Sequence, residues 1–469
     1  MLNIKGRVLF LYPNTEGDGG IPNGLALLSG GLKAAGFETA CFDTTFLKAP
    51  PKTHLYRQKH GGVLKADHLK YWGDYWDPTV PEKIPELFKK AVDDFRPDLI
   101  AVTIIDVSYK FVVALLGEFR KTVKVPVIAG GPTVTMCPDM VINNDGIDIV
   151  CVGEGEDPLV ELAESLVEGR DHAAIKNLWV KKEGKIIKNP LRPLKDMATL
   201  SFQDWSIFDK RHYYKPYCGS FFRTGFFELA RGCPFNCTFC CTASLKELYE
   251  KKGDFLRFRD IDRTMDEVSM VKDRYGLELV FFIDDNFLGM PPERFDLFCE
   301  RYKSRIGLPF YIQTRPETIS EGYIKKLKDA NVSSIGIGIE NGNVELRKTH
   351  MRRYMSNEKI IEAFDIVHKH GIRTTANIII GMPYEKECMF RETIDLLRKI
   401  RPKSISINYF QPYRGTEMRK MAVDLGYIPE DHIIGDSNTC IDMPDFRKDR
   451  QIHFYENFKK YLDGEIPLD

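Results

Sequence analysis

Short apolar runs alternate with helical patterns over the first 170 residues of the chain. Each apolar run has the length of one strand, and the segments between them place apolar residues at helical spacing. Strands that are apolar throughout and alternate with helices predict a parallel sheet with helices on both faces. The expected strands are residues 7–13, 38–43, 98–103, 125–129 and 148–152, and the expected helices are residues 24–36, 84–95, 108–121 and 156–167.

The same alternation starts again near residue 225 and continues through six strands. Strands joined in this way by helices run parallel, and six such units predict a partial barrel. In barrels of this kind the chemistry lies on the loops at the carboxyl ends of the strands. The expected strands are residues 225–230, 279–283, 309–314, 333–339, 374–380 and 404–410, with helices such as residues 264–275 and 358–370 between them.

Three segments belong to neither pattern. Residues 171–222 read as a linker that contains a hairpin turning at Glu183 and Gly184. The insert at residues 48–80 is too long for a simple connection, which leaves a functional segment and a mobile one as alternatives. Residues 426–469 form a polar extension after the last strand. We therefore expect a first domain at residues 1–170, the linker, a barrel at residues 223–425 and this extension.

Composition and charge exclude several classes of protein. Lys plus Arg and Asp plus Glu both total 67, so no net charge favours nucleic acid or an anionic membrane. The chain has no apolar stretch of about 18 residues that would cross a membrane, and its first apolar run is too short for a signal peptide. The 11 cysteines are odd in number and scattered, unlike a secreted disulfide framework. These features predict a cytoplasmic protein without a membrane segment.

Glycine-containing turns follow the expected strands of the first domain. Ligands of open parallel sheets bind outside the carboxyl ends of the strands. Glycine at such ends lets the backbone come close to a large ligand, and tight turns alone are the alternative. The segments concerned are residues 13–20, 103–108, 130–133 and 153–156.

Three cysteines lie within eight residues directly after the first barrel strand. They are Cys233, Cys237 and Cys240. Thiolates are soft ligands that suit iron–sulfur clusters or zinc. Three thiolates can hold three irons of a four-iron cluster and leave the fourth iron open, whereas a structural zinc site normally has four ligands. Cys241 is adjacent to Cys240 in a tight loop, and we do not expect it to reach the same cluster.

This spacing, with Phe239 just before the last cysteine, resembles the radical S-adenosylmethionine (radical SAM) superfamily. The resemblance implies an open 4Fe-4S cluster whose free iron chelates the amino and carboxylate groups of S-adenosylmethionine. Reduction by one electron then releases a 5′-deoxyadenosyl radical. It also implies that the backbone of Phe239 lies near the adenine.

Other strand ends fit the same family. An acidic Asp-Asp-Asn segment follows the second barrel strand, and Arg315 and Glu340 end the third and fourth. The resemblance implies that these ends contact S-adenosylmethionine, and Arg315 has the charge to pair with a carboxylate. The residues so implied are Phe239, Asp284, Arg315, Gly338, Glu340 and Gly381.

The parallel domain ahead of the barrel resembles that of the cobalamin-binding radical SAM proteins. The resemblance covers nearly the whole chain and implies a Rossmann-like, flavodoxin-type cobalamin domain followed by a partial (β/α)6 TIM-like barrel. The implied cobalamin contacts are Thr103, Ser108, Gly130, Gly131, Thr133, Gly153, Glu154 and Gly155. The Asp-x-His-x-x-Gly motif of many other cobalamin proteins is absent, and no histidine in residues 1–170 has that setting. We therefore expect no histidine ligand to cobalt, and a domain that kept its fold but lost cobalamin is the alternative.

Three functions fit these observations. A cobalamin-dependent enzyme would methylate or rearrange an unactivated carbon, with the cofactors supplying the chemistry. A radical enzyme that forms a ring or oxidises its substrate, like the family's anaerobic cyclases, is the second. A non-catalytic iron–sulfur or zinc protein is the third. The first two imply a reduced flavodoxin or ferredoxin-type electron donor. The substrate, a small molecule or a peptide, has no signature in the sequence.

Overall fold

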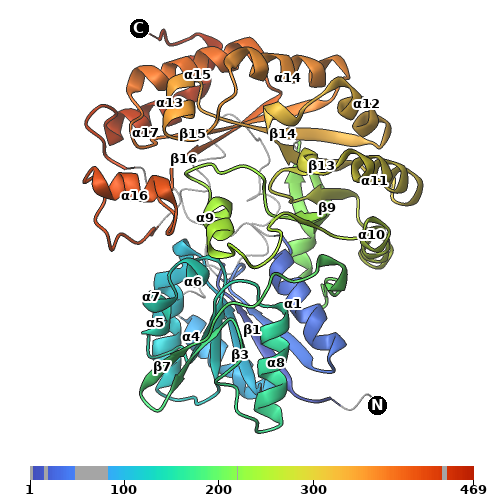
Figure 1. Ribbon diagram of the computed structural model, residues 1–469, viewed down its shortest axis with the longest axis vertical. Helices are drawn as coiled ribbons and strands as arrows, with labels where there is room; N and C mark the ends of the chain where they lie inside the picture. Colours follow the sequence, from blue (N-terminus) through green and yellow to red (C-terminus); the bar gives the residue numbers. More distant parts are fainter. Residues whose placement is uncertain (1–3, 15–19, 48–82, 219, 436–440, 469) are drawn as a thin grey trace. The chain divides into compact units, whose positions relative to one another are not determined.

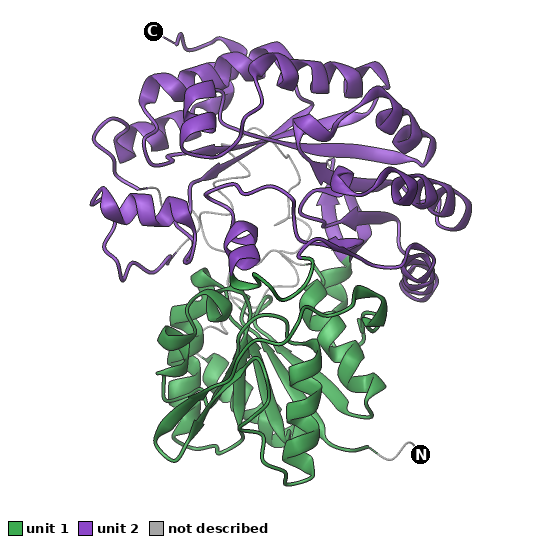
Figure 2. Cartoon of the chain, viewed as in Figure 1, with its two compact units in different colours: residues 1–51, 69–213, 248–254 green, residues 52–68, 214–247, 255–469 purple. Residues whose placement is uncertain are grey.

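The structure is a computed structural model that describes residues 4–14, 20–47, 83–218, 220–435 and 441–468. The insert at residues 48–80 lies outside this described part. The chain forms two compact units, shown in Figure 2. Unit 1 comprises Met1–Pro51, Leu69–Tyr213 and Leu248–Asp254, and unit 2 comprises Lys52–His68, Tyr214–Glu247 and Phe255–Asp469. A short piece of the chain from the middle of unit 2 therefore belongs to unit 1.

Unit 1 contains the parallel sheet that the apolar runs predict (Figure 1). Its strand order is β2-β1-β3-β4-β5. Val8 lies opposite Leu99 and Ile128 opposite Ile149 in this sheet. Its five parallel strands are β1 (Arg7–Tyr12), β2 (Glu38–Asp43), β3 (Leu99–Thr103), β4 (Val127–Gly130) and β5 (Ile149–Cys151). This is the flavodoxin-type order, which confirms the predicted fold of this part.

Helices cover the sheet of unit 1. Their apolar faces pack on strand residues such as Phe10, Ile100 and Val150, which are fully buried. The helices are α1 (Asn23–Ala34), α4 (Ile84–Phe95), α5 (Tyr109–Arg120), α6 (Pro132–Met136), α7 (Pro138–Ile142) and α8 (Glu156–Val167). Helices α1 and α8 contact each other, as do α4 and α5.

The predicted hairpin is present as β6 (Leu178–Lys182) and β7 (Lys185–Lys188). Glu183 and Gly184 both have positive φ, 51° and 75°, as a two-residue hairpin turn with the sheet's twist requires. The hairpin pairs antiparallel with β5 and so extends the sheet of unit 1.

Unit 2 contains a second sheet, in the order β16-β15-β14-β13-β12-β9-β8. Its six parallel strands are β9 (Ser220–Phe227), β12 (Leu279–Phe282), β13 (Phe310–Thr314), β14 (Val332–Glu340), β15 (Arg373–Ile380) and β16 (Ser404–Tyr409). The short strand β8 (Tyr214–Tyr217) pairs antiparallel with β9. The first and last parallel strands do not pair, so the sheet is the partial barrel that the sequence predicts.

Helices follow the strands of unit 2 and begin at side chains that cap them. Asp260, Ser320 and Ser356 each accept a hydrogen bond from a backbone N–H of the first helical turn. The helices after the first five strands are α9 (Cys241–Leu248), α10 (Ile261–Tyr275), α11 (Pro292–Arg305), α12 (Glu321–Asp329), α13 (Val344–Thr349), α14 (Asn357–Lys369) and α15 (Glu387–Ile400). The last are α16 (Glu417–Asp424), α17 (Lys448–Glu456) and α18 (Phe458–Asp463).

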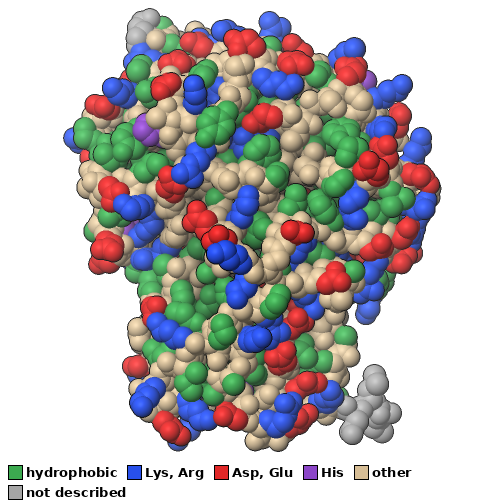
Figure 3. All heavy atoms as spheres, in the orientation of Figure 1, with side chains coloured by type: hydrophobic (Ala, Val, Ile, Leu, Met, Phe, Trp, Pro, Cys, Tyr) green, Lys and Arg blue, Asp and Glu red, His purple; other side chains and the backbone are tan. Residues whose placement is uncertain are grey.

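Two general properties of the described chain bear on its partners. No helix in the described ranges is both long and apolar enough to cross a membrane. Basic and acidic side chains are interspersed over the face shown in Figure 3, in keeping with their equal numbers in the sequence.

Candidate functional site

The loop that carries the three cysteines is fixed to two other segments of unit 2. Thr238 in the loop donates a hydrogen bond from Oγ1 to the carbonyl of His350 at 2.6 Å. The carbonyl of Thr238 accepts one from the backbone N–H of Met418 at 2.9 Å. Within the loop, the N–H of Cys240 donates to the carbonyl of Cys237 at 3.1 Å, which closes a tight turn. The cysteines are therefore held on a folded loop.

The three thiols differ in their surroundings. Cys237 is buried, and its Sγ accepts hydrogen bonds from Nη1 of Arg315 at 3.1 Å and Nη1 of Arg353 at 3.8 Å. Burial raises the pKa of Cys233 to about 11 and also raises the pKa of Cys240. Thiols with such pKa values stay protonated at neutral pH unless a metal takes the place of the proton. The donor set fits a group that brings positive charge to the loop.

Among the described residues, no three His, Cys, Asp or Glu side chains lie close enough to hold one metal ion. A structural zinc ion would need four such ligands around it, so the described chain offers no closed zinc site. An iron–sulfur cluster makes a different demand, because each cysteine binds a different iron and the sulfurs stand further apart. The cysteine loop offers three thiols, the number that can hold three irons of such a cluster.

Arg315 and Arg353 join the cysteine loop to strands β13 and β14. The guanidinium of Arg315 lies over the ring of Phe235 at 3.7 Å and pairs with Glu317 at 2.6 Å. Nη1 of Arg353 lies 3.6 Å from Oε1 of Glu340, and Arg353 also donates to the carbonyl of Gly338. Burial raises the pKa of Glu340 although both arginines lower it. The structure thus brings two cations to the buried cysteine, and each cation has a carboxyl group beside it, Glu317 at Arg315 and Glu340 at Arg353.

Asp284 contacts the segment that leads into the cysteine loop. Its Oδ1 accepts a hydrogen bond from the N–H of Leu229 at 3.0 Å. Its Oδ2 is buried and has no hydrogen-bond partner in the described chain. Burial and the neighbouring Glu228 raise the pKa of Asp284 to about 8. Asp284 is therefore a mostly protonated acid at neutral pH, next to the strand that leads into the cluster loop.

Two predicted S-adenosylmethionine contacts of unit 2 are still to be placed, Gly381 and Phe239. Gly381 donates its N–H to Glu385 at 2.6 Å, and Glu385 also accepts hydrogen bonds from Met382 and Asn341. Glu385 thus closes the turn after β15. Phe239 is half-buried within the cysteine loop. The structure brings together Cys237, Arg315, Gly338 and Glu340. Gly381 is linked through Glu385 to Asn341, the residue that follows Glu340.

In unit 1, four of the predicted cobalamin contacts lie together at the ends of β3 and β4. A Cβ at Gly131, where φ is 105°, would come within 2.8 Å of the carbonyl of Ile104 and 2.9 Å of Oγ1 of Thr103. Thr133 donates a hydrogen bond to Asp106 at 2.5 Å, so its hydroxyl is already occupied. Gly130 is half-exposed, and a Cβ there would have no neighbour closer than 4.0 Å.

The apolar side chain of Ile105 lies beside this edge with 47% of its surface exposed. An exposed isoleucine next to an uncrowded glycine forms a surface on which a flat ring can lie. The ends of β3 and β4 therefore present an exposed apolar side chain and an uncrowded glycine, as contact with a flat ring requires.

The other predicted cobalamin contacts are occupied by the protein itself. The backbone N–H of Glu154 donates to the hydroxyl of Tyr249 at 2.8 Å. A Cβ at Gly153, where φ is 84°, would lie 1.9 Å from that hydroxyl. The carboxylate of Glu154 accepts from the N–H of Lys195 at 3.0 Å. A Cβ at Gly155 would pack 3.6 Å from Leu28, and the hydroxyl of Ser108 bonds the backbone of Ile105.

The contacts of three residues had no signal in the sequence. Arg353 has no motif around it, and Tyr249 reaches Glu154 across 95 positions of sequence. His212 lies outside residues 1–170 and pairs through Nε2 with Asp43, the last residue of β2. Its ring is fully buried beside Tyr12 and Phe46, and its Nδ1 has no hydrogen-bond partner in the described chain. Nothing in the sequence around it pointed to this pair.

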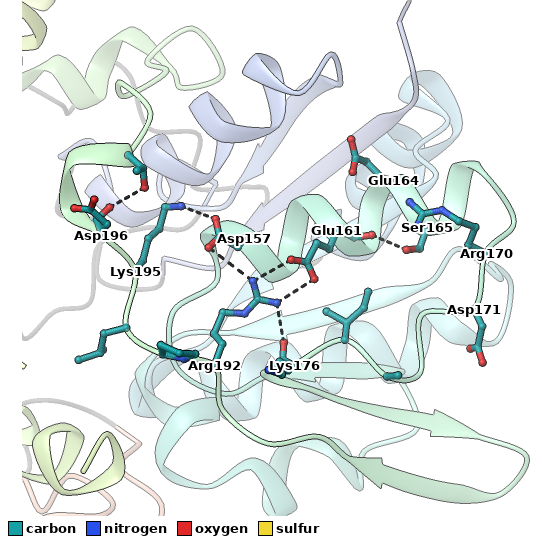
Figure 4. A pocket seen from close by; sticks show the side chains of 15 residues that line it. Asp157, Glu161, Glu164, Ser165, Arg170, Asp171, Lys176, Arg192, Lys195 and Asp196 are labelled. Atoms are coloured by element: carbon teal, nitrogen blue, oxygen red, sulfur yellow. Dashed lines mark hydrogen bonds and ion pairs between the residues drawn. The ribbon is translucent and has the colours of Figure 1, made fainter. Parts of the chain in front are cut away.

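A groove of ≈ 800 Å³ runs beside α8 in unit 1 (Figure 4). Arg192 points at Glu161 and Asp157 of α8, at 3.0 Å and 3.7 Å, and Lys195 pairs with Asp157 at 2.5 Å. These cations attach the segment after the hairpin to α8. The charged residues that line the groove are therefore explained by this attachment, without a ligand.

Comparisons with known proteins match two different families to the two parts of the chain. The model of the Radical SAM superfamily matches residues 227–397, and the model of the B12 binding domain matches residues 65–163. An uncharacterized methyltransferase of Pyrococcus horikoshii is 27% identical over 340 residues, 71% of each chain. The anaerobic magnesium-protoporphyrin IX monomethyl ester cyclase of Rubrivivax gelatinosus is 25% identical over 425 residues, 87% of this chain and 68% of the cyclase.

Among solved structures, the radical S-adenosylmethionine methyltransferase TsrM of Kitasatospora setae, with cobalamin and a [4Fe-4S] cluster bound, is similar with a TM-score of 0.70. The match covers 90% of this chain and 78% of TsrM at 18% identity, so it shows the shared fold. Together with the cysteine loop and the flavodoxin-type sheet, these matches confirm the predicted fold and family. The chain therefore contains a radical SAM domain at residues 227–397, preceded in sequence by a B12-binding domain at residues 65–163.

Proposed function

We propose that the protein is a cobalamin-dependent radical SAM enzyme that transfers a methyl group to an unactivated carbon of its substrate. The observation that carries the proposal is the meeting of Cys237, Arg315, Arg353 and Glu340 at the ends of β13 and β14. It supports a site for a charged ligand directly beside a thiolate-bound cluster. The match to the B12 binding domain supports cobalamin as the second cofactor.

The cysteines and their neighbours have separate tasks in this proposal. Cys233, Cys237 and Cys240 would hold three irons of a 4Fe-4S cluster. Once reduced by an external donor, a cluster bound there would supply the electron that cleaves S-adenosylmethionine to methionine and the 5′-deoxyadenosyl radical. Arg315 and Arg353 provide positive charge for the carboxylate of S-adenosylmethionine, and Glu340 faces its amino group.

The edge at β3 and β4 holds cobalamin in this proposal. Thr103, Gly130 and Gly131 provide the backbone and small side chains on which the corrin rests, and Ile105 provides an apolar contact. Cobalamin bound there would carry a methyl group taken from a second S-adenosylmethionine, and would supply it to the substrate carbon from which the 5′-deoxyadenosyl radical has removed a hydrogen atom. We expect no histidine ligand to cobalt from residues 1–170, as the sequence indicated.

Ring formation is the second candidate, because the cyclase of Rubrivivax gelatinosus aligns with 87% of this chain. A cyclase would use the same cluster and the same radical source, and would leave no new methyl group on the product. Either reaction needs an external reductant, for which we propose a flavodoxin or ferredoxin-type protein.

The test is anaerobic reconstitution with iron, sulfide and hydroxocobalamin, followed by incubation with S-adenosylmethionine labelled in its methyl group. The proposal predicts one cluster and one cobalamin per chain, and label in the product once a substrate is supplied. Product without label would favour the cyclase. Protein that forms the cluster but retains no cobalamin after gel filtration would contradict the proposal.

A further inference from the structure

Tyr384 occupies a backbone conformation that tyrosine rarely adopts. It lies in the turn between β15 and α15, and its φ is +67°. A bulky side chain is disfavoured in this left-handed region, whereas glycine adopts it freely. Such outliers persist where the surrounding structure holds them, and they concentrate at functional sites. The sequence at this turn therefore retains a tyrosine where glycine would be the relaxed choice.

The ring of Tyr384 stacks on the ring of His350. The ring centroids lie 4.0 Å apart and the planes differ by 13°. Burial lowers the pKa of His350, so its imidazole is neutral at pH 7 and the pair presents no net charge. Despite the stack, 40% of the Tyr384 surface remains exposed. The pair forms a flat and uncharged aromatic surface, which we call the aromatic platform.

The aromatic platform is attached to the cysteine loop. The carbonyl of His350 accepts the 2.6 Å hydrogen bond from Thr238, the residue after Cys237. His350 ends α13, which follows β14, and Tyr384 follows β15. Both rings thus belong to loops at the carboxyl ends of barrel strands, where the chemistry of such barrels takes place. Tyr413, after β16, has 42% of its surface exposed on the next such loop.

We propose that the aromatic platform binds the substrate and selects one with a flat, conjugated ring system. Stacking on an aromatic face is favourable for any planar π system and needs no charge on the ligand. A saturated substrate would make only apolar contact with the two rings and would lack the additional stacking interaction. This inference rests on the proposed function, because it assigns the substrate of the same site.

The test uses two flat probes, protoporphyrin IX monomethyl ester and L-tryptophan, in equilibrium dialysis against the reconstituted holoprotein. The variants are Tyr384→Gly, Tyr384→Phe and the control Tyr354→Gly, since Tyr354 is 70% exposed. We expect the wild type to bind at least one probe and Tyr384→Gly to bind it at least tenfold more weakly. Tyr384→Phe should bind like the wild type because it keeps the ring, and so should the control.

Thermal unfolding of the same variants separates stacking from misfolding. Tyr384→Gly should still unfold cooperatively near the wild-type temperature, because relief of the left-handed strain offsets the stacking lost with the ring. The proposal is overturned if the wild type binds neither probe or if Tyr384→Gly binds as tightly. An equal loss of S-adenosylhomocysteine binding in Tyr384→Gly would also overturn it, because the platform would then serve the adenine. Formation of 5′-deoxyadenosine, measured in parallel, shows independently whether the proposed function holds.

Discussion

Arg315 donates a hydrogen bond from Nη1 to the sulfur of Cys237 at 3.1 Å, although the two residues are 78 positions apart in sequence. The contact places a cation from the third barrel strand against the cysteine loop. Nη1 of Arg353 approaches the same sulfur to 3.8 Å and lies 3.6 Å from Glu340. A buried sulfur with two guanidinium groups beside it is suited to the thiolate form, in which cysteine binds iron.

The arginine group predicts how S-adenosylmethionine binds. Arg315→Ala and Glu340→Ala should each weaken its binding at least about tenfold, because each removes a charged partner of the amino-acid moiety. Iron content should stay near that of the wild type. The measurement is equilibrium binding of S-adenosylmethionine to the reconstituted, unreduced protein. Arg373→Ala is the matched control, since exposed Arg373 begins β15 at its amino end. Unchanged binding in both variants would remove Arg315 and Glu340 from the site.

The cysteine triad predicts which thiols hold iron. Substitution of Cys233, Cys237 or Cys240 by alanine should abolish the cluster and all cleavage of S-adenosylmethionine. Cys241→Ala should keep most of its iron, because Cys241 begins α9 and lies outside the triad. Iron and sulfide analysis of the four reconstituted variants is the measurement. Loss of iron in Cys241→Ala as great as in Cys240→Ala would show that the triad is wrongly chosen.

Tyr249 predicts a stability effect inside unit 1. Tyr249→Phe removes the hydroxyl that accepts the hydrogen bond from the N–H of Glu154. The free energy of unfolding should fall by about 1 kcal/mol, the usual net value of one hydrogen bond. Denaturant unfolding of the cofactor-free protein measures the loss. The exposed Tyr354→Phe should show none, and a Tyr249→Phe variant as stable as the wild type would contradict the assigned contact.

The raised pKa of Asp284 predicts that the free energy of unfolding depends on pH. Its pKa is raised from 3.8 to about 8 in the folded protein, chiefly by burial. Between these pH values the folded state holds a proton that the unfolded state has lost, so stability falls as pH rises. Asp284→Asn should reduce this fall by up to about 1.4 kcal/mol per pH unit. Unfolding of the cofactor-free protein from pH 5 to pH 8 checks it, with exposed Asp273→Asn as control. Identical slopes in Asp284→Asn and wild type would refute the shift.

Gly131 predicts the position of cobalamin. Gly131→Leu should lower the cobalamin retained after gel filtration and leave the iron content unchanged. The reason is that its side chain would crowd Ile104 and Thr103 at the edge of the sheet. Gly169→Leu is the control, since Gly169 also has positive φ but open space around it. Equal cobalamin retention in the two variants would place the corrin elsewhere.

Local patterns in the sequence were sufficient for the fold. The strands that became β1 to β5 and β12 to β16 are apolar runs bounded by turns, and their alternation with helices leaves few topologies. The cysteine spacing was equally readable, because the three cysteines lie within eight residues, and their role as ligands stays a prediction. Residues 48–80 gave no such pattern and lie outside the described part of the chain.

Contacts between distant segments could not be predicted from the sequence. Arg353 meets Cys237 across 116 positions, and His212 meets Asp43 across 169. Single arginines and histidines in loops carry no periodicity that would reveal such pairs. The segment around Glu154 illustrates the same limit, since its glycines indicated a ligand and the structure places Tyr249 against them.

The most direct test of the central claim is the amount of 5′-deoxyadenosine formed by the reduced, reconstituted protein with cobalamin bound. Wild-type protein incubated anaerobically with S-adenosylmethionine should release 5′-deoxyadenosine, and Cys237→Ala should release none. Absence of 5′-deoxyadenosine from wild-type protein with a full complement of iron, or equal amounts from both proteins, would contradict the assignment of a radical SAM enzyme.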